Sequence, residues 1–172
     1  SGDTSSYSIN GGADAAVFSI SGSDLILTDG LLDFETKASY EVTVRITDSG
    51  GLTHDQTFTI TVNDLNEAPG FTSTADTSAT EDALYSYSIT TSDPDSGASL
   101  TINATTLPAW LTLTDNGDGT AMLSGTPTNA EVGDHSVSLE VTDGALTATQ
   151  SFTLTVSNVN DDPVITSPAS FS

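Results

Sequence analysis

Residues 40–73 read YEVTVRITDSGGLTHDQTFTITVNDLNEAPGFTS, and residues 135–167 read HSVSLEVTDGALTATQSFTLTVSNVNDDPVITS. The two stretches align with one residue deleted at the first turn, so that Phe58 falls on Phe152 and Pro69 on Pro163. The repeat period is about 94 residues, which is the size of one β-sandwich domain. A chain of 172 residues therefore reads as a tandem array of such domains.

The apolar residues of the repeat alternate with polar ones, as in a strand that is buried on one face. Tyr40, Val42, Val44 and Ile46 follow this pattern. No segment has the apolar spacing of a full helix. We predict an all-β fold of Greek-key, immunoglobulin-like β-sandwich modules in an elongated array. Other strands are expected at 7–9, 17–20, 25–27, 58–62, 85–89, 100–102, 122–123, 137–141 and 152–156, with a hairpin turn at 115–119.

The chain is strongly acidic, with 24 Asp+Glu against 2 Lys+Arg and a formal charge of −22. Such self-repulsion calls for high salt or bound cations. Lys37 and Arg45 alone cannot form a basic patch, so nucleic acid and anionic membrane surfaces are not expected partners. Cysteine is absent, which excludes disulfides and zinc-thiolate sites. No run approaches the ~18 apolar residues of a membrane helix, so we expect no direct membrane insertion.

The stretch Asn63–Pro69 follows a predicted strand and ends at a proline, and an altered copy recurs as Ser157–Pro163. Both are dense in side-chain oxygen and free of Lys and Arg. Hard cations such as Ca²⁺ take roughly 6 to 8 oxygen ligands, which suits a cluster of this kind. Asn, Asp and Pro also dominate ordinary turns, so composition alone leaves a metal site and an Asx turn equally open.

The first part of the chain resembles cadherin-type modules of large bacterial repeats-in-toxin surface adhesins. Leu32-Asp33-Phe34-Glu35, Ile46-Thr47-Asp48 and Asp64–Pro69 match the L-D-R-E, A-x-D and D-x-N-D-x-P patterns of that family, with Phe34 in place of its Arg and Glu67 in place of Asp. The second part resembles the dystroglycan-type cadherin-like variety. Its motifs are Glu81-Asp82, Asp93-Pro94-Asp95, Leu107–Leu111, Leu123–Pro127 and Gly133–His135.

The resemblance implies three segments. Residues 1–66 would be a partial cadherin-like β-sandwich lacking its first strands, residues 67–162 a complete one, and residues 163–172 a linker and the start of a third module. The first residues match Ser96 onward, so about 25 to 30 residues of the first module are absent. Three sources are open: upstream sequence, the earlier half of a module split by an inserted domain, or the tail Pro163–Ser172 of a neighbouring molecule.

The resemblance also implies Ca²⁺ as the bound cofactor, held at the junction between successive modules. The expected ligands are the side chains of Asp33, Glu35, Asp64, Asn66, Glu67, Asp93, Asp95 and Asp143 and the carbonyls of Leu65 and Ala68. A weaker second set at the far end would comprise Glu81, Asp134, Asn158, Asn160 and Asp161. It is weaker because Asn158 stands where the first copy has Asp64.

We expect no enzyme activity, since no nucleophile elbow is visible and neither His54 nor His135 has an evident catalytic partner. Trp110 is read as a packing residue rather than a sugar platform. The expected function is that of calcium-rigidified extender modules of a bacterial cell-surface adhesin, whose partners are neighbouring modules of the same chain. The polysaccharide or cell-surface protein ligand would bind through another domain. The rival hypothesis is a doublet or split-domain scaffold that itself binds or presents a binder of polysaccharide or peptide.

Overall fold

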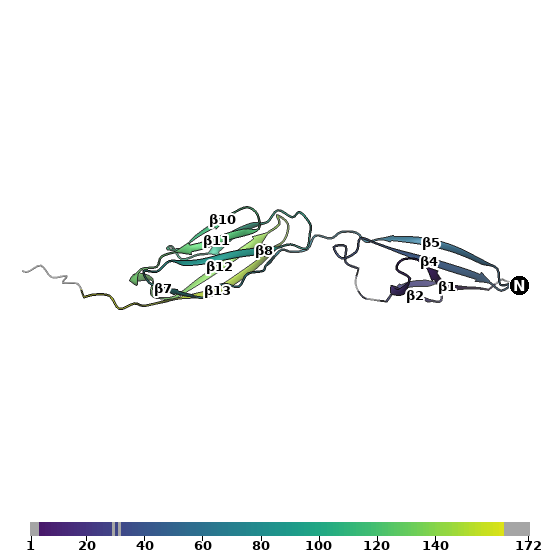
Figure 1. The fold of residues 1–172 in the computed structure, drawn as a ribbon, viewed down its shortest axis with the longest axis horizontal. Coiled ribbons are helices and arrows are strands. Elements are labelled where there is room, and N and C mark those ends of the chain that lie inside the picture. The colour runs from purple at the N-terminus through teal and green to yellow at the C-terminus, as the bar shows by residue number, and fades with distance from the viewer. Residues whose placement is uncertain (1–3, 29, 31, 164–172) are drawn as a thin grey trace, which may run out of the picture. The chain divides into compact units, whose positions relative to one another are not determined.

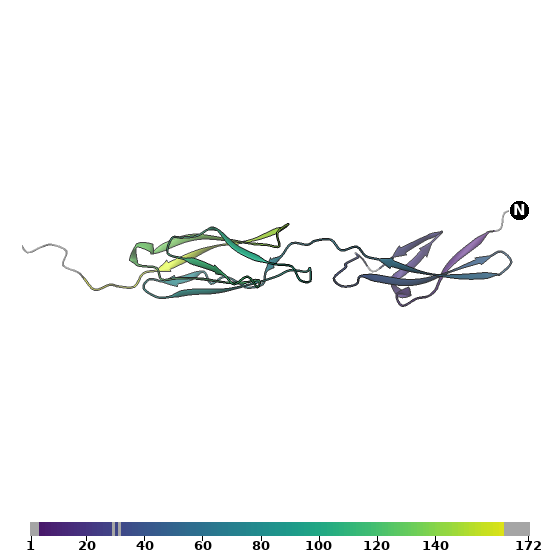
Figure 2. The same cartoon turned by 90° about the horizontal axis from the view of Figure 1, so that it is seen from above.

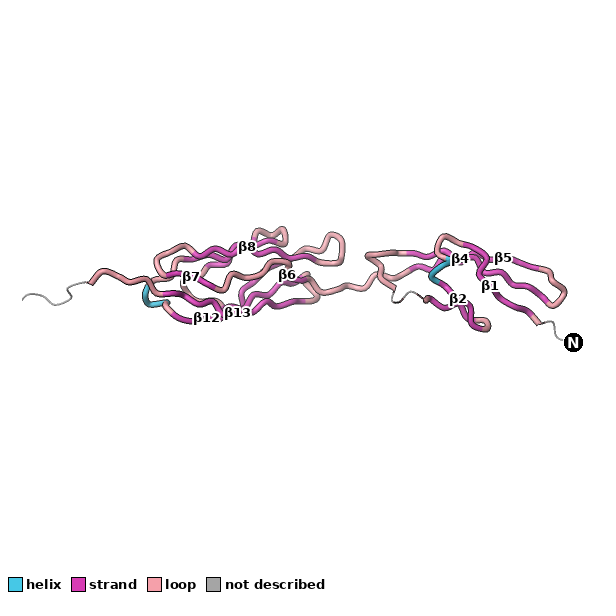
Figure 3. The backbone as a smooth tube through the Cα atoms, turned by 60° about the horizontal axis from the view of Figure 1, so that its bottom comes forward, coloured by secondary structure: helices cyan, strands magenta, loops and turns pink. Residues whose placement is uncertain are grey.

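The computed structural model describes residues 4–28, 30 and 32–163. The chain divides into two compact units, Ser1–Asn66 and Glu67–Ser172. Strands dominate both units, and the described helices are two single turns of 3-10 helix (Figure 3). None of the described helices is long and apolar enough to cross a bilayer. The expected all-β fold is confirmed, whereas the predicted start of a third module lies almost entirely outside the described residues.

The described residues of the first unit form five strands in two small sheets. One sheet has the order β1-β4-β5, and the other is the hairpin β2-β3 (Figure 1). The strand predicted from residue 17 begins one residue later, because the Val17 amide bonds the Asp14 carbonyl and closes a 3-10 turn. The elements are β1 (Ser5–Gly11), η1 (Ala15–Val17), β2 (Phe18–Ser21), β3 (Asp24–Leu27), β4 (Ser39–Asp48) and β5 (Thr53–Thr61).

The β4–β5 hairpin carries the small apolar centre of this unit. Tyr40 lies opposite Ile60 and Val42 opposite Phe58, so the alternating apolar residues of the two strands share one face, as predicted. Among the described residues of the unit, the buried apolar side chains are those of Tyr40, Val42 and Val62. Apolar burial in the first unit is therefore slight.

Both basic residues of the chain are engaged within the first unit. Arg45 Nε and Nη2 donate to the Asp55 carboxylate at 2.7 and 2.8 Å across the β4–β5 ladder. Lys37 pairs with Asp14, whose other oxygen accepts the Glu41 amide at 2.8 Å. These bonds tie the first turn after β1 to the start of β4.

The second unit is a β-sandwich of two four-stranded sheets. Their orders are β10-β11-β8-β6 and β7-β13-β12-β9, with β7 parallel to β13 and the other pairings antiparallel. Figure 2 shows the sheets as two layers. The elements are β6 (Gly70–Phe71), β7 (Ser78–Thr80), β8 (Tyr85–Ser92), β9 (Thr101–Thr106), β10 (Thr112–Asp115), β11 (Thr120–Gly125), η2 (Asn129–Glu131), β12 (Gly133–Thr142) and β13 (Thr147–Ser157).

The core of the second unit joins side chains from both sheets. Leu123 on one sheet and Leu139 and Leu154 on the other are 0% exposed and belong to a single buried cluster. Full burial of each such leucine contributes about 2 kcal/mol relative to exposure. The predicted hairpin at 115–119 joins β10 to β11, and Gly117 and Gly119 supply the positive φ angles that its turn requires.

Trp110 and Gly125 lie together at the edge of this core. A Cβ atom on Gly125 would come within 2.2 Å of the Trp110 carbonyl oxygen, so glycine alone fits there. The Trp110 ring meets Tyr85 and His135 edge-on, at centroid distances of 6.3 and 5.9 Å. The interpretation of Trp110 as a packing residue is confirmed.

Candidate functional site

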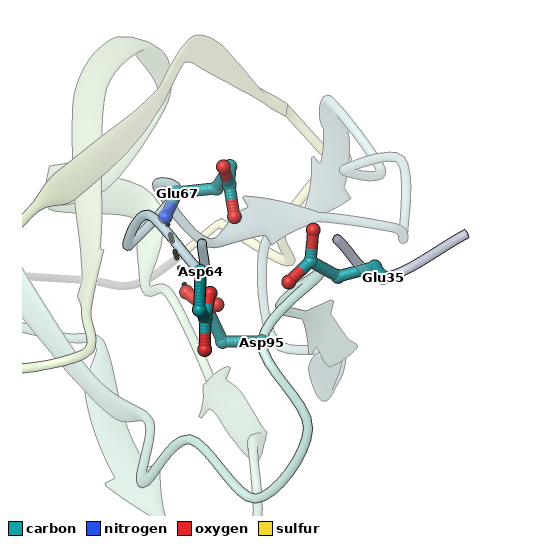
Figure 4. A group of neighbouring side chains, drawn as sticks. All are labelled: Glu35, Asp64, Glu67 and Asp95. Atoms are coloured by element: carbon teal, nitrogen blue, oxygen red, sulfur yellow. Dashed lines mark hydrogen bonds between the residues drawn. The ribbon is translucent and has the colours of Figure 1, made fainter. Parts of the chain in front are cut away.

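At one end of the first unit, β4 begins and β5 ends beside each other, since Ser39 pairs with Thr61. Glu35 precedes β4 and Asp64 follows β5, so both reach the same end of the sheet. One carboxylate oxygen of Glu35 lies within 4.8 Å of one of Asp64 (Figure 4). Two acids therefore face one another at the edge of this unit.

Asp33 lies in the same segment, and its side chain accepts hydrogen bonds that stabilise a local turn. Its two oxygens accept the Thr36 amide at 3.0 Å and the Thr36 hydroxyl at 2.9 Å. These hydrogen bonds lower the pKa of the Asp33 carboxyl below its ordinary value of 3.8. Asp33 is thus ionised at neutral pH.

The second unit gathers its acids at the end where β6 starts and β8 stops, because Gly70 pairs with Ser92. The Glu67 amide donates to Oδ2 of Asp95 at 3.0 Å (Figure 4), and the Asp95 amide donates to Oδ1 of Asp93 at 2.9 Å. A Glu67 oxygen and an Asp95 oxygen lie within 4.8 Å. Asp93 Oδ2 is buried and accepts no hydrogen bond from the described residues.

Asp143 reaches this same end, because the preceding Thr142 pairs with the first residue of β9. Its Oδ1 accepts the amides of Ala145 and Leu146 at 2.6 and 2.7 Å. Asp48, its counterpart in the first unit, accepts the amides two and four residues ahead in the same way. In both copies this aspartate therefore shapes the hairpin turn with one oxygen.

Leu65, Asn66 and Ala68 lie in the irregular segment between β5 and β6. All three are exposed, with Leu65 at 75%. A leucine so exposed contributes little to packing, which fits the prediction that this segment offers carbonyl oxygens. The carbonyls of Leu65 and Ala68 remain predicted ligands.

The opposite end of the second unit is organised around Glu81, which is 1% exposed. Ser157 pairs with Thr80, so Glu81 and Asn158 leave their strands side by side. Oε1 of Glu81 accepts the Asn158 side-chain amide at 2.9 Å and the Val159 backbone amide. Oε2 is buried and accepts no hydrogen bond from the described residues.

The other members predicted for this end are more loosely held. Asp134 accepts the Thr155 hydroxyl at 2.6 Å, across the β12–β13 ladder. Asn160 and Asp161 are exposed beyond the last strand. The partner missed from sequence is the Val159 amide, because no side-chain pattern marks a backbone donor.

The structure thus brings together three pairs of residues from the two predicted ligand sets, each pair within a single unit. These are Glu35 with Asp64, Glu67 with Asp95, and Glu81 with Asn158. Asp93 joins the second pair through the Asp95 amide. Asp33, Asp134 and Asp143 instead bond to nearby turns and strands.

Comparisons with known proteins describe the fold of both units. The model of the family described as "Putative Ig domain" (He_PIG) matches residues 68–157. Cadherin domains 3–6 of protocadherin gamma B2 align over 91% of this chain at 23% identity and a TM-score of 0.67. Domains 1–4 of protocadherin gamma B3 align over 91% at 21% identity and a TM-score of 0.68. This chain covers 40% and 41% of those two chains.

An endo-fucoidan hydrolase from glycoside hydrolase family 107 also contains a similar portion. It aligns over 92% of this chain at 23% identity and a TM-score of 0.50, while this chain covers 24% of the hydrolase. This chain therefore spans less than half of each of these solved chains. At such identities the likeness establishes a cadherin-like β-sandwich fold.

Proposed function

The chain belongs to the "Putative Ig domain" family, and from that membership we propose that its two units are spacer modules of an extracellular bacterial surface adhesin. Ca²⁺ ligated by the acids at the module ends stiffens them, so that a ligand-binding domain elsewhere in the adhesin is held away from the cell. The cadherin-like fold supports this proposal. The observation that carries it is the position of two carboxylate pairs. Glu35 and Asp64 lie at the end of the first unit where the chain leaves it, and Glu67 and Asp95 lie at the end of the second unit where the chain enters it.

Covalent connection alone limits the distance between Asp64 and Glu67. Asp64 belongs to the pair of the first unit and Glu67 to the pair of the second. They are three residues apart, so their Cα atoms lie within about 11 Å of each other in any conformation. A Ca²⁺ ion needs roughly 6 to 8 oxygens at about 2.3–2.6 Å, more than either pair provides. A shared ion therefore completes its shell by drawing on both pairs.

The charge of the chain also supports bound cations. The sequence has 24 Asp+Glu against 2 Lys+Arg, and Lys37 and Arg45 pair with Asp14 and Asp55, so basic side chains are too few to neutralise the acids of the chain. Neighbouring carboxylates repel when ionised, and a divalent ion converts this repulsion into attraction. The buried Asp93 Oδ2 fits an ion ligand, since a buried polar atom normally has a partner.

The far end of the second unit supports a second, weaker site. Glu81 offers one buried oxygen that accepts no hydrogen bond from the described part of the chain, and Asp134, Asn158, Asn160 and Asp161 supply further oxygens near the same strand ends. The Asn158 amide group provides one neutral oxygen where Asp64 provides a charged carboxylate. We therefore propose a lower affinity for Ca²⁺ at this end.

The packing of Trp110, the only tryptophan in the sequence, favours a structural role over carbohydrate binding. Trp110 packs against the core and against the His135 ring, and His135 Nε2 bonds the Glu131 carbonyl at 2.6 Å. Neither ring is then presented as a flat sugar platform, and His135 is held as a packing residue. We propose no catalytic role for the chain.

Small-angle scattering of residues 1–172 tests this function. Ca²⁺ should narrow the distribution of interatomic distances relative to excess EDTA, because the ion restricts rotation about the segment between Asp64 and Glu67. The double variant Glu35→Gln/Asp95→Asn is the matched control and should scatter alike in both conditions. Identical curves for the unsubstituted chain with and without Ca²⁺ would contradict the proposal.

A further inference from the structure

Where the structure describes them, the two units share five strands in the same pairing order, and the second unit has three more. β1, β2, β3, β4 and β5 pair with one another as β9, β10, β11, β12 and β13 do. β6, β7 and β8 are the additional strands. In the second unit β11 also pairs with β8, and β13 also pairs with β7. Within the described residues of the first unit, β3 pairs with β2 alone and β5 with β4 alone, so each has an open edge.

Two side chains of β5 match residues that β8 covers in the second unit. The repeat places Gln56 on Gln150 and Phe58 on Phe152. In the second unit, the ring of Tyr87 on β8 meets Phe152 edge-on at 6.2 Å and 89°. Its hydroxyl donates to Gln150 Oε1 at 3.0 Å. The second unit thus uses one tyrosine to engage both residues.

In the first unit the same two side chains lie on the apolar face of the β4–β5 hairpin, but they are exposed. Phe58 is 47% exposed, and the Gln56 side-chain amide donates to the adjacent Thr57 carbonyl. The first unit therefore presents the phenyl ring and the amide oxygen that receive a tyrosine in the second.

The neighbouring apolar residues are also more buried in the second unit than in the first. Leu139, in the sheet that does not contain β8, is 0% exposed, whereas its counterpart in the repeat, Val44, is only half-buried. The side chains that β8 directs into the core, Tyr85, Tyr87 and Ile89, are 4%, 5% and 1% exposed. The open part of the first unit thus corresponds to the space that those three side chains occupy in the second.

We infer that the first unit binds an extended strand that runs antiparallel along β3 and places a tyrosine over Phe58 with its hydroxyl on Gln56. Strand addition at an open edge satisfies backbone groups, while alternate side chains give specificity. The partner is a segment outside residues 1–172 with large apolar residues at every second position. A second copy is a poor donor, because its β8 is already paired on both edges and buried.

A synthetic peptide of residues 70–93, which carries β6, β7 and β8, serves as the probe. Added to the chain of residues 1–172, it should slow amide hydrogen exchange in β3 at least about tenfold. The same peptide with Tyr87→Ser should have much less effect. Phe58→Ala in the chain should weaken binding of the unsubstituted peptide at least about tenfold, and Leu52→Ala, at a residue that is 76% exposed, should not.

A second measurement covers the case in which the separate peptide binds too weakly to be detected. Residues 70–93 fused ahead of residue 1 through a flexible linker should protect β3 without added peptide. Failure of both the peptide and the fusion to protect β3 would overturn the inference. So would light scattering that shows a dimer in which β3 is already protected, since the occupant would then be a second copy.

Discussion

The backbone amide of Glu67 donates a hydrogen bond to Oδ2 of Asp95, at 3.0 Å, inside the second unit. This bond fixes the Asp95 carboxylate against the segment that enters β6, and it does so without an ion. The Asp95 amide in turn holds Asp93. The acids of this end are thereby pre-positioned, which lowers the ordering cost of binding a cation.

Asp95→Asn should raise the Kd for Ca²⁺ at least about tenfold, because it removes one charged ligand. The fold should persist, since an asparagine oxygen can still accept the Glu67 amide. Calorimetric titration of the variant against the unsubstituted chain measures this. Asp24→Asn, which removes the same charge on β3, is the control and should bind as the unsubstituted chain does. An equal loss in both variants would mean that net charge alone drives binding.

The variant Glu81→Gln tests whether Glu81, at the far end of the second unit, binds Ca²⁺ or only stabilises the fold through its hydrogen bonds. Glutamine keeps the oxygen that accepts the Asn158 and Val159 amides and removes a buried charge, so stability in EDTA should be unchanged or higher. In Ca²⁺ the variant should be stabilised less than the unsubstituted chain. Urea unfolding in both conditions measures this difference.

The neighbouring residue provides the control for that experiment. Asp82 is exposed and has φ of 58°, a conformation that asparagine also adopts readily, so Asp82→Asn should behave as the unsubstituted chain. An equal loss for Glu81→Gln in EDTA and in Ca²⁺ would show that Glu81 is purely structural.

Low pH should destabilise the first unit, because Asp14 becomes protonated. The hydrogen bond from Lys37, followed by that from the Glu41 amide, lowers the pKa of Asp14 below its ordinary value of 3.8. A carboxyl with a lowered folded-state pKa stabilises the fold above its unfolded pKa, and this contribution is lost as pH falls through the folded value. The melting temperature should therefore drop below about pH 4, and Asp14→Asn should flatten that drop. A variant that keeps the full acid dependence would contradict the assignment.

High pH should destabilise the second unit, because the Tyr85 hydroxyl ionises. Burial raises the pKa of its hydroxyl from 10.0 to about 12, and that hydroxyl donates to the Asp76 carbonyl at 2.7 Å. A raised folded-state pKa gives stability that is complete below pH 10 and is lost as pH rises through the folded value. Urea unfolding between these values should show the loss. Tyr85→Phe should cost about 1 kcal/mol at neutral pH and reduce the alkaline dependence, whereas Tyr7→Phe should do neither.

The long strands followed from sequence because their apolar residues alternate over enough positions to define a face. The repeat alignment placed Asp48 on Asp143, and both residues hold their hairpins with the same pair of amide bonds. β6 and β7 contain two and three residues, too few to show a period, and long-range pairing defines them.

The chemistry of the acidic residues was harder to predict than the strands. Glu81 and Asp82 are adjacent acids that composition does not distinguish, yet one is 1% exposed and the other is exposed, because only Glu81 turns toward Asn158. For Asp33, the turn and metal interpretations both remain, since its oxygens bond Thr36 and keep acceptor capacity. The metal ligands as a set remain a prediction.

Thermal unfolding of residues 1–172 in saturating Ca²⁺ and in excess EDTA, at matched ionic strength, tests calcium binding most directly. A ligand at 100 times its Kd stabilises the folded state by about 2.7 kcal/mol. The melting temperature should therefore rise by at least about 5 °C in Ca²⁺. Mg²⁺ should give much less, because it requires octahedral geometry and retains its waters. Equal melting temperatures in Ca²⁺ and EDTA, or an equal rise in Mg²⁺, would contradict the account.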